Sequence, residues 1–228
     1  MKTVAVTTSS DRASAAAIPF TFLGLQPMLL PCISVESAGA STLAAVREAA
    51  QDADLLVVSS PRTIDILWPD GSLPDVEFAV VGASSSRTVK DRGGRVAVTG
   101  ARGSAQLAEI LAPLVGDKHV VWPHADGADP APLLKLSSSA ARFTAQTIYT
   151  SVPIAPFPDP VDVISLASPS AVTGWQISRS LAEAPIAVIG ATTRQAVIGA
   201  GATVAIVAPD PTFQSLAQAV SEYLGVAS

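Results

Sequence analysis

The segment DLLVVSSPRTID, residues 54–65, returns 108 positions later as DVISLASPSAVT, residues 162–173. A second pair follows at the same offset: FAVVGASSSRTVKDRGGRVAV at residues 78–98 and IAVIGATTRQAVIGAGATVAI at residues 186–206. This spacing is much longer than the unit of a solenoid repeat. The duplication therefore predicts two similar lobes, and two lobes that face each other would enclose a cleft.

Strand-like apolar runs alternate with helical patterns along the chain, which predicts an α/β protein with parallel, flavodoxin-like sheets flanked by helices. One such pattern predicts a helix over residues 170–182. Ser60-Pro61 and Ser168-Pro169 are typical of a capping residue followed by proline in the first turn of a helix.

Two stretches are predicted to be extended linkers between the lobes, one near residues 33–40 and a proline-rich one near residues 150–160. With these linkers the chain starts in one lobe, builds the other and then returns. Lobe one would be residues 1–34 plus 152–228, and lobe two residues 36–149. The alternative is two sequential halves divided near Gly116; the prolines favour the first arrangement.

The composition excludes several classes of protein. Of 228 residues, 49% are hydrophobic and 14% are charged, so a sizeable core is expected. A net charge of −5 without a basic cluster argues against a nucleic-acid partner. No apolar run is long enough for a membrane span, and polar residues interrupt the N-terminal segment too early for a signal peptide. We therefore expect no membrane partner, a cytoplasmic location and, because the duplication carries no dimer signature, a monomer.

Motifs for common cofactors and metals are absent from the sequence. It contains neither a phosphate-binding G-x-x-x-x-G-K-[ST] loop nor a G-x-G-x-x-G dinucleotide motif. The single cysteine, Cys32, excludes an internal disulfide and is interpreted as a small buried hydrophobic residue. His119 and His124 lack a neighbouring set of further ligands. The sequence thus predicts neither a metal nor a cofactor.

Several local patterns, taken in order, resemble uroporphyrinogen-III synthase over nearly the whole chain. They are VAVTT at residues 4–8, DLLVVSS at 54–60, VVG at 80–82 before three serines, TIYT at 147–150, SPSAV at 168–172 and IGATT at 189–193. Two departures are notable, because Thr7-Thr8-Ser9 stands where the family often has Thr-Arg-Pro, and Pro123-His124-Ala125 where it often has Pro-Arg-Gly.

The resemblance implies a cyclising hydro-lyase that needs no cofactor. Its substrate would be the linear tetrapyrrole hydroxymethylbilane and its product uroporphyrinogen III, the precursor of haem, sirohaem and corrinoids. Ring A would lose its hydroxyl to give an azafulvene, ring D would attack through its substituted carbon, and the spiro intermediate would reclose with ring D inverted. The alternative is a non-catalytic cytosolic two-lobe protein of the same fold that binds a small anion or acts as a regulator.

The substrate implied by the resemblance carries eight carboxylates, whereas the chain has only 14 Lys and Arg residues. Backbone N–H groups at helix N-termini, together with nearby hydroxyls, offer another way to bind anions. The predicted substrate-binding residues are Thr7, Thr8, Ser60, Ser84, Ser85, His124, Ser168, Ser170, Thr192 and Thr193. For any one Ser or Thr the alternative is simple helix capping, and for His124 it is an exposed loop residue.

Tyr149 is predicted to be catalytic, because a phenol at the end of a strand beside the return linker could give a proton or a hydrogen bond to the departing hydroxyl. The other tyrosine, Tyr223, is interpreted as a packing residue. Four arginines are considered as carboxylate partners but interpreted as solvated surface residues: Arg12, Arg62, Arg142 and Arg194.

Overall fold

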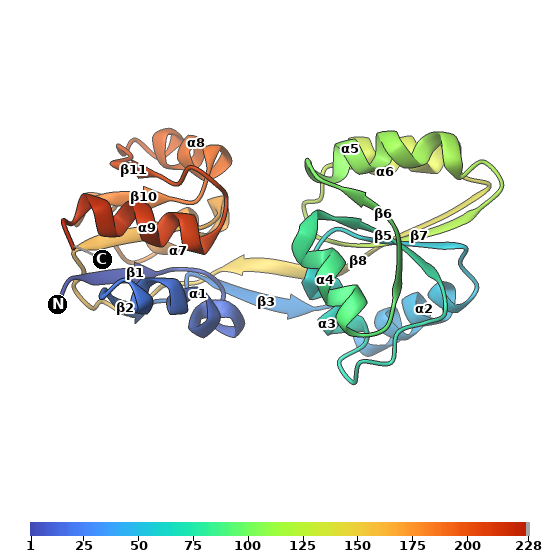
Figure 1. The fold of residues 1–228 in the computed structure, drawn as a ribbon, viewed down its shortest axis with the longest axis horizontal. Helices are drawn as coiled ribbons and strands as arrows, with labels where there is room; N and C mark the ends of the chain where they lie inside the picture. Colours follow the sequence, from blue (N-terminus) through green and yellow to red (C-terminus); the bar gives the residue numbers. More distant parts are fainter. Residues whose placement is uncertain (227–228) are drawn as a thin grey trace. The chain divides into compact units, whose positions relative to one another are not determined.

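The computed structural model describes residues 1–226 and divides the chain into two compact units (Figure 1). Unit 1 comprises Met1–Val35 and Ser151–Ser228, and unit 2 comprises Glu36–Thr150. In Figure 1, unit 1 carries the colours of both chain ends, because its strands come from the N-terminal and C-terminal parts of the sequence.

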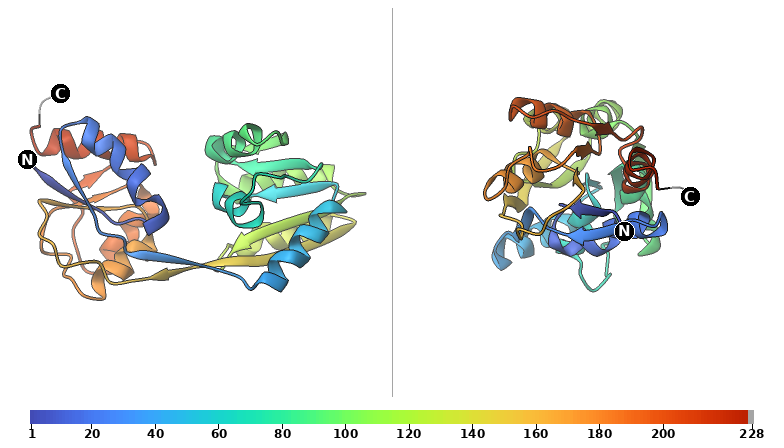
Figure 2. Two further views of the ribbon diagram at one scale, coloured as in Figure 1. Left: turned by 90° about the horizontal axis from the view of Figure 1, so that it is seen from below. Right: turned by 90° about the vertical axis from the view of Figure 1, so that its left-hand side faces the viewer.

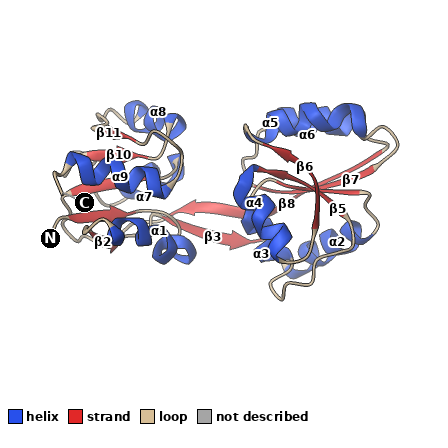
Figure 3. Cartoon of the chain, viewed as in Figure 1, coloured by secondary structure: helices blue, strands red, loops and turns tan. Residues whose placement is uncertain are grey.

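Unit 1 is a parallel five-stranded sheet with the order β2-β1-β9-β10-β11. Its elements are β1 (Thr3–Val6), α1 (Ser10–Phe22), β2 (Gln26–Leu29), β9 (Val163–Leu166), α7 (Pro169–Gln176), β10 (Ile186–Val188), α8 (Ala191–Gly199), β11 (Ile206–Val207) and α9 (Phe213–Tyr223). Helices cover both faces of the sheet (Figure 3). One face packs on α1 and α9 through Val4 and Val6, and the other packs on α7 and α8 through Ala5.

Unit 2 is a six-stranded sheet with the order β3-β8-β7-β4-β5-β6. Its elements are β3 (Ile33–Ser37), α2 (Ala40–Gln51), β4 (Leu55–Val58), α3 (Pro61–Leu67), β5 (Glu77–Val81), α4 (Gly82–Asp91), β6 (Arg95–Gly100), α5 (Gly103–Leu111), a 3-10 turn (Ala112–Leu114), β7 (His119–Ala125), α6 (Pro130–Ser139) and β8 (Arg142–Pro153). Helices α5 and α6 pack on one face through Val57 and Trp122, and α2, α3 and α4 cover the other (Figure 1). The predicted fold class, two parallel-sheet lobes flanked by helices, is confirmed.

The two units share one topology, but the chain enters and leaves that topology at different strands. The spatial order β8-β7-β4-β5-β6 corresponds strand by strand to β2-β1-β9-β10-β11. In unit 2 the chain passes through α5 from β6 into β7, whereas in unit 1 the equivalent helix α9 ends the chain and β1 begins it. Unit 1 is therefore a circular permutation of unit 2, which explains why the repeat visible in the sequence covers only part of each unit.

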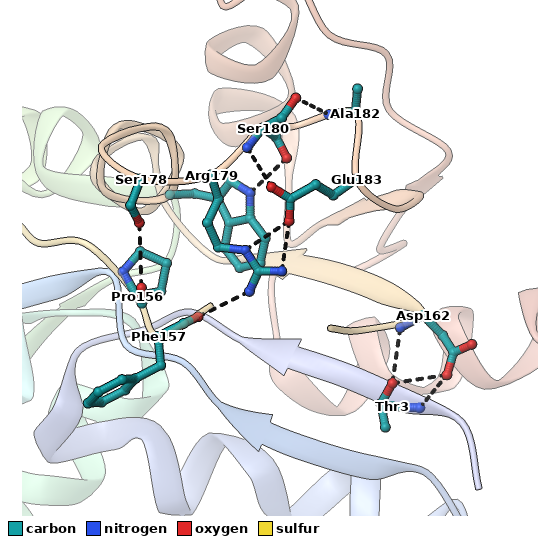
Figure 4. A network of polar contacts seen from close by, with 10 residues as sticks. Thr3, Pro156, Phe157, Asp162, Ser178, Arg179, Ser180, Ala182 and Glu183 are labelled. Atoms are coloured by element: carbon teal, nitrogen blue, oxygen red, sulfur yellow. Dashed lines mark hydrogen bonds and ion pairs between the residues drawn. The ribbon is translucent and has the colours of Figure 1, made fainter. Parts of the chain in front are cut away.

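Equivalent aspartates join the first strand of each repeat to its neighbour. Asp162 accepts the backbone N–H of Thr3 at 2.8 Å (Figure 4). Its own N–H bonds to the carbonyl oxygen of Thr3 at 3.0 Å. Asp54 accepts the N–H of His119 at 2.7 Å and donates its own N–H to the carbonyl oxygen of His119 at 3.0 Å. The same pair of hydrogen bonds thus sets the register of β9 with β1 and of β4 with β7.

The chain passes between the units through β3 and the end of β8, which are neighbours in the sheet (Figure 2). Residues 33–37 therefore form a strand, and residues 150–153 continue β8. Beyond β8, the N–H of Ile154 bonds to the carbonyl oxygen of Cys32 at 2.9 Å. These hydrogen bonds connect the two segments that were predicted to be linkers.

The helix predicted over residues 170–182 is too long, because α7 ends at Gln176. The following turn is held by polar contacts of its own (Figure 4). Trp175 donates from Nε1 to the carbonyl oxygen of Ser180 at 3.1 Å. Arg179 lies over the Trp175 ring, bonds to Glu183, and donates to the carbonyl oxygen of Phe157 at 3.1 Å. This network ends the helix and fastens the proline-rich segment to it.

Candidate functional site

In an open parallel sheet, ligands bind outside the carboxyl ends of the strands, where neighbouring connections leave in opposite directions. In unit 1 this switch point lies between β1 and β9, because β1 is followed by β2 on one side and β9 by β10 on the other. In unit 2 it lies between β4 and β7. Each unit therefore has a candidate site of its own, and the two are described separately.

In unit 1 the strand ends carry small hydroxyl side chains with structural partners. Thr7 is almost fully buried and its hydroxyl donates to the carbonyl oxygen of Ser165 at 2.7 Å. Ser168 accepts the backbone N–H of Ala171 at 3.2 Å and thereby caps α7. Thr8 is buried and Ser170 is half-buried. The hydroxyl proton of Thr7 is thus already engaged, and Ser168 serves as a helix cap.

In unit 2 a tyrosine of β8 lies beside an arginine that follows the end of β4. Tyr149 is 8% exposed, and its carbonyl oxygen accepts the N–H of Asp126 at 2.8 Å. The guanidinium carbon of Arg62 lies 5.7 Å from the centroid of the Tyr149 ring. Arg62 is half-buried, so its interpretation as a solvated surface residue was wrong. The sequence signal was its place directly after the Ser60-Pro61 cap, in the turn that follows β4.

Ser60 and His124 also border the candidate site of unit 2. Ser60 accepts the backbone N–H of Arg62 at 3.3 Å and so caps α3. His124 is half-buried, and its Nδ1 lies 2.8 Å from the carbonyl oxygen of Ala125. One nitrogen of this ring is therefore occupied within its own loop.

The second pair of helices in the repeat starts differently from the first. Val81 and Gly190 stand at the N-cap positions of α4 and α8, and neither residue caps its helix with a side-chain hydrogen bond. Gly82 opens α4 with φ +77°, a left-handed conformation that disfavours any residue with a side chain. The first-turn N–H groups and the positive end of the helix dipole can therefore act on an anion at these two helix starts.

The hydroxyls predicted at these helix starts fall into two classes. Ser84 and Thr192 are exposed, whereas Ser85 and Thr193 are buried. In the described part of the chain the Ser85 hydroxyl has no hydrogen-bond partner. The exposed pair can thus contact a ligand directly, and the buried pair stands at equivalent positions of the two repeats.

The described residues do not indicate a reactive thiol, a metal site or a membrane-spanning helix. Burial raises the pKa of the Cys32 thiol to about 12, an effect that the charge of Arg179 partly opposes, so the thiol stays protonated at neutral pH. Within residues 1–226 no group of three or more His, Cys, Asp or Glu side chains is arranged to hold a metal ion. No helix in the same range combines the length and hydrophobicity needed to cross a membrane.

The chain matches the family model described as uroporphyrinogen-III synthase HemD over residues 15–218. Its fold is similar to that of uroporphyrinogen-III synthetase from Helicobacter pylori, with a TM-score of 0.69, 12% identity and 99% of each chain covered. It is also similar to a mutant uroporphyrinogen III synthase from Thermus thermophilus, with a TM-score of 0.60, 17% identity and 100% of each chain covered. No curated protein sequence matches it significantly.

Proposed function

The chain belongs to the uroporphyrinogen-III synthase HemD family and is a hydro-lyase, and from this premise we propose that it cyclises hydroxymethylbilane to uroporphyrinogen III with inversion of ring D. The observation that carries the proposal is the family match over residues 15–218, which spans both units. The uncapped starts of α4 and α8 add physical support, because they supply anion-binding groups in a protein whose net charge is negative.

We propose that substrate carboxylates bind at these helix starts. An acidic chain repels a polyacid at long range, but backbone N–H donors and helix dipoles act locally and carry no counter-charge. In unit 2 the α4 start would bind one carboxylate with Ser84, and in unit 1 the α8 start would bind another with Thr192. Ser60, Ser168 and Thr7 support the local backbone in this proposal instead of contacting the substrate.

Tyr149 is proposed to protonate the leaving hydroxyl of ring A. The pyrrole nitrogen supplies the electron pair that expels the hydroxyl, and the hydroxyl leaves as water with the phenol proton. Ring D then attacks through its substituted carbon, and a proton released by the pyrroles as the macrocycle forms returns to the phenolate. The net change is the loss of one water molecule. Fixing the folded substrate accounts for the choice of product, since the free substrate is expected to close without inversion.

The test is to incubate the protein with freshly generated hydroxymethylbilane and to separate type I from type III uroporphyrinogen. An excess of the type III isomer over a protein-free blank is expected. A product mixture identical to the blank would overturn the proposal. If the substrate then still bound, as measured by protection against thermal unfolding, the non-catalytic alternative would be supported instead. We also propose that the protein acts as a monomer, which light scattering after size-exclusion chromatography would test.

A further inference from the structure

The strand registers place Tyr149 just beyond the end of β4. Strand β4 pairs with β7 through Leu55 and Val120 and through Leu56 and Val121. This register, continued along both strands, brings the last residue of β4 level with Pro123. Tyr149 pairs with Ala125, two residues further along β7. The phenol-bearing residue thus lies about 6–7 Å past the carboxyl end of β4, at the level of the first turn of α3.

Arg62 stands in that first turn, and its guanidinium lies over the Tyr149 ring at 5.7 Å. A cation within about 6 Å of an aromatic ring centroid is attracted by the negative face of the ring. Both side chains are shielded from solvent, Tyr149 almost completely and Arg62 by half, so the attraction is screened less than at an open surface. The contact favours one orientation of the phenol ring.

The equivalent positions in unit 1 cannot form such a pair. Ser9 pairs with Ile33 in unit 1 as Ala125 pairs with Tyr149 in unit 2, so Ile33 stands where Tyr149 does. Ser170 stands where Arg62 does, at the offset of the repeat. An aliphatic side chain and a serine replace the aromatic ring and the cation. The pair therefore belongs to unit 2 and is no general requirement of the duplicated fold.

We propose that Arg62 is the positioning residue for Tyr149, an inference that rests on the proposed function. It holds the phenol ring in the orientation that directs its hydroxyl toward the leaving group, and it places a positive charge where negative charge develops as the phenol gives up its proton. Arg62 acts through Tyr149 and not by binding the substrate. Its contribution therefore belongs to the chemical step and disappears when the phenol hydroxyl is absent.

The test is a double-mutant cycle on the full chain with Arg62→Met, Tyr149→Phe and the double variant. Arg62→Lys is added as the conservative variant. Arg95→Met is the matched control, because it also removes one arginine, and Arg95 forms an exposed ion pair with Asp75 at the start of β6. Steady-state formation of type III product from hydroxymethylbilane gives kcat and KM for each variant. Near-UV circular dichroism measures the Tyr149 band of the wild type, which is the wild-type spectrum minus the Tyr149→Phe spectrum. The band of each arginine variant is compared with it.

Arg62→Met is expected to lower kcat about tenfold with KM changed less than about threefold, within the range of a shielded cation–π contact. Adding it to Tyr149→Phe should change kcat less than about twofold, Arg62→Lys should recover part of the loss, and Arg95→Met should match the wild type. The Tyr149 band should change in Arg62→Met and stay unchanged in Arg95→Met.

Three results would overturn the inference while the wild type still makes type III product. The first is a rise in KM with kcat unchanged in Arg62→Met, which would assign Arg62 to substrate binding. The second is a double variant whose loss of kcat equals the product of the losses in Arg62→Met and Tyr149→Phe. The third is a Tyr149 band that Arg62→Met leaves unaffected. A wild-type protein that makes no excess of type III product overturns the proposed function, and the inference with it. The spectroscopic comparison needs no turnover, so the two kinds of failure are distinguishable.

Discussion

Unit 1 and unit 2 have the same strand order, equivalent aspartate hydrogen bonds between neighbouring strands and equivalent serine caps. Their switch points nevertheless carry different side chains. Unit 1 offers Thr8, Ser170 and Ile33 where unit 2 offers His124, Arg62 and Tyr149. At these three compared positions, the side chains able to transfer a proton or carry a charge all lie in unit 2. The two repeats thus retain the strand order, the aspartate hydrogen bonds and the helix caps that stabilise each unit, while the residues at their switch points differ.

The units also differ in how closely one helix approaches its neighbours. Gly174 of α7 stands where α3 has Ile66. A Cβ at Gly174 would collide with the carbonyl oxygen of Cys32, and it would lie 2.9 Å from the carbonyl oxygen of Ile154. Only glycine allows α7 to touch these two segments, which carry the connections to unit 2. Helix α3 has no such constraint at the equivalent position.

Among the substitutions that test the difference between the units, Gly174→Ala is expected to have the largest effect. We expect it to lower the free energy of unfolding by about 3 kcal/mol, because two backbone segments would have to move. Urea unfolding followed by tryptophan fluorescence measures the change. Gly199→Ala at the end of α8, where a Cβ would meet nothing within 4 Å, is the control and should be neutral or slightly stabilising. Equal midpoints for the two variants would contradict the close packing described for α7.

Tyr149→Phe tests whether the chemistry is confined to unit 2. Loss of the phenol hydroxyl is expected to lower the rate of type III formation about a hundredfold, which corresponds to about 2.7 kcal/mol of activation free energy. Thermal stability should stay close to that of the wild type. Tyr223 in α9 is exposed, so its interpretation as a packing residue was wrong, and Tyr223→Phe should leave the rate unchanged. An unchanged rate in Tyr149→Phe would remove the main chemical difference between the units.

Ser60→Ala and Ser168→Ala test the equivalence of the two caps. Each substitution removes one hydrogen bond from a side chain to the backbone at a helix start and should cost about 1 kcal/mol of stability. Because the sites lie in different units, the double variant should lose close to the sum. A cost confined to one of the two serines, as measured by chemical unfolding, would show that the repeats do not use their caps alike.

The smallest expected effect concerns Asp162 and pH. The N–H of Thr3, then Lys2 and the Thr3 hydroxyl, lower the pKa of the Asp162 carboxyl from 3.8 to about 2. The ionised form is thus favoured in the folded state, so its stabilisation is present above about pH 4 and is lost as the pH falls toward 2. Because the carboxylate is 35% exposed, solvent screening limits the effect to about 1 kcal/mol.

Unfolding of the wild type and of Asp162→Asn should therefore be compared at pH 6 and at pH 2.5. The difference between them should be about 1 kcal/mol at the higher pH and should shrink at the lower one. A difference that grew as the pH fell would contradict the direction of the shift.

The sequence alone predicted the features that repeat. The 108-residue offset indicated two similar lobes, and the Ser-Pro pairs indicated the starts of α3 and α7. The length of α7 was mispredicted, because the turn after Gln176 is held by contacts of Arg179 with Glu183 and Phe157. Such contacts between segments distant in sequence leave no periodic signal.

The candidate site was predictable only in outline. Tyr149 was expected at the end of a strand, but β8 continues to Pro153, so Tyr149 lies within the strand and pairs with the last residue of β7. The arginine over its ring depends on how β4, β7 and β8 lie side by side. The uncapped starts of α4 and α8 were also hidden, since serines and threonines follow them closely and resemble ordinary caps. Residue type alone does not reveal which hydroxyl is turned inward, as it is for Ser85.

The circular permutation also sets the order in which the nascent chain can fold. Unit 2 is continuous, so all of its strands have left the ribosome once residue 150 has emerged. Strand β1 precedes unit 2 in the chain, whereas its partner β9 and the helix α9 that covers it follow unit 2. Because domains fold as units during translation, we expect unit 2 to fold while the apolar side chains of β1 are still exposed, since the partners that bury them have not yet been synthesised.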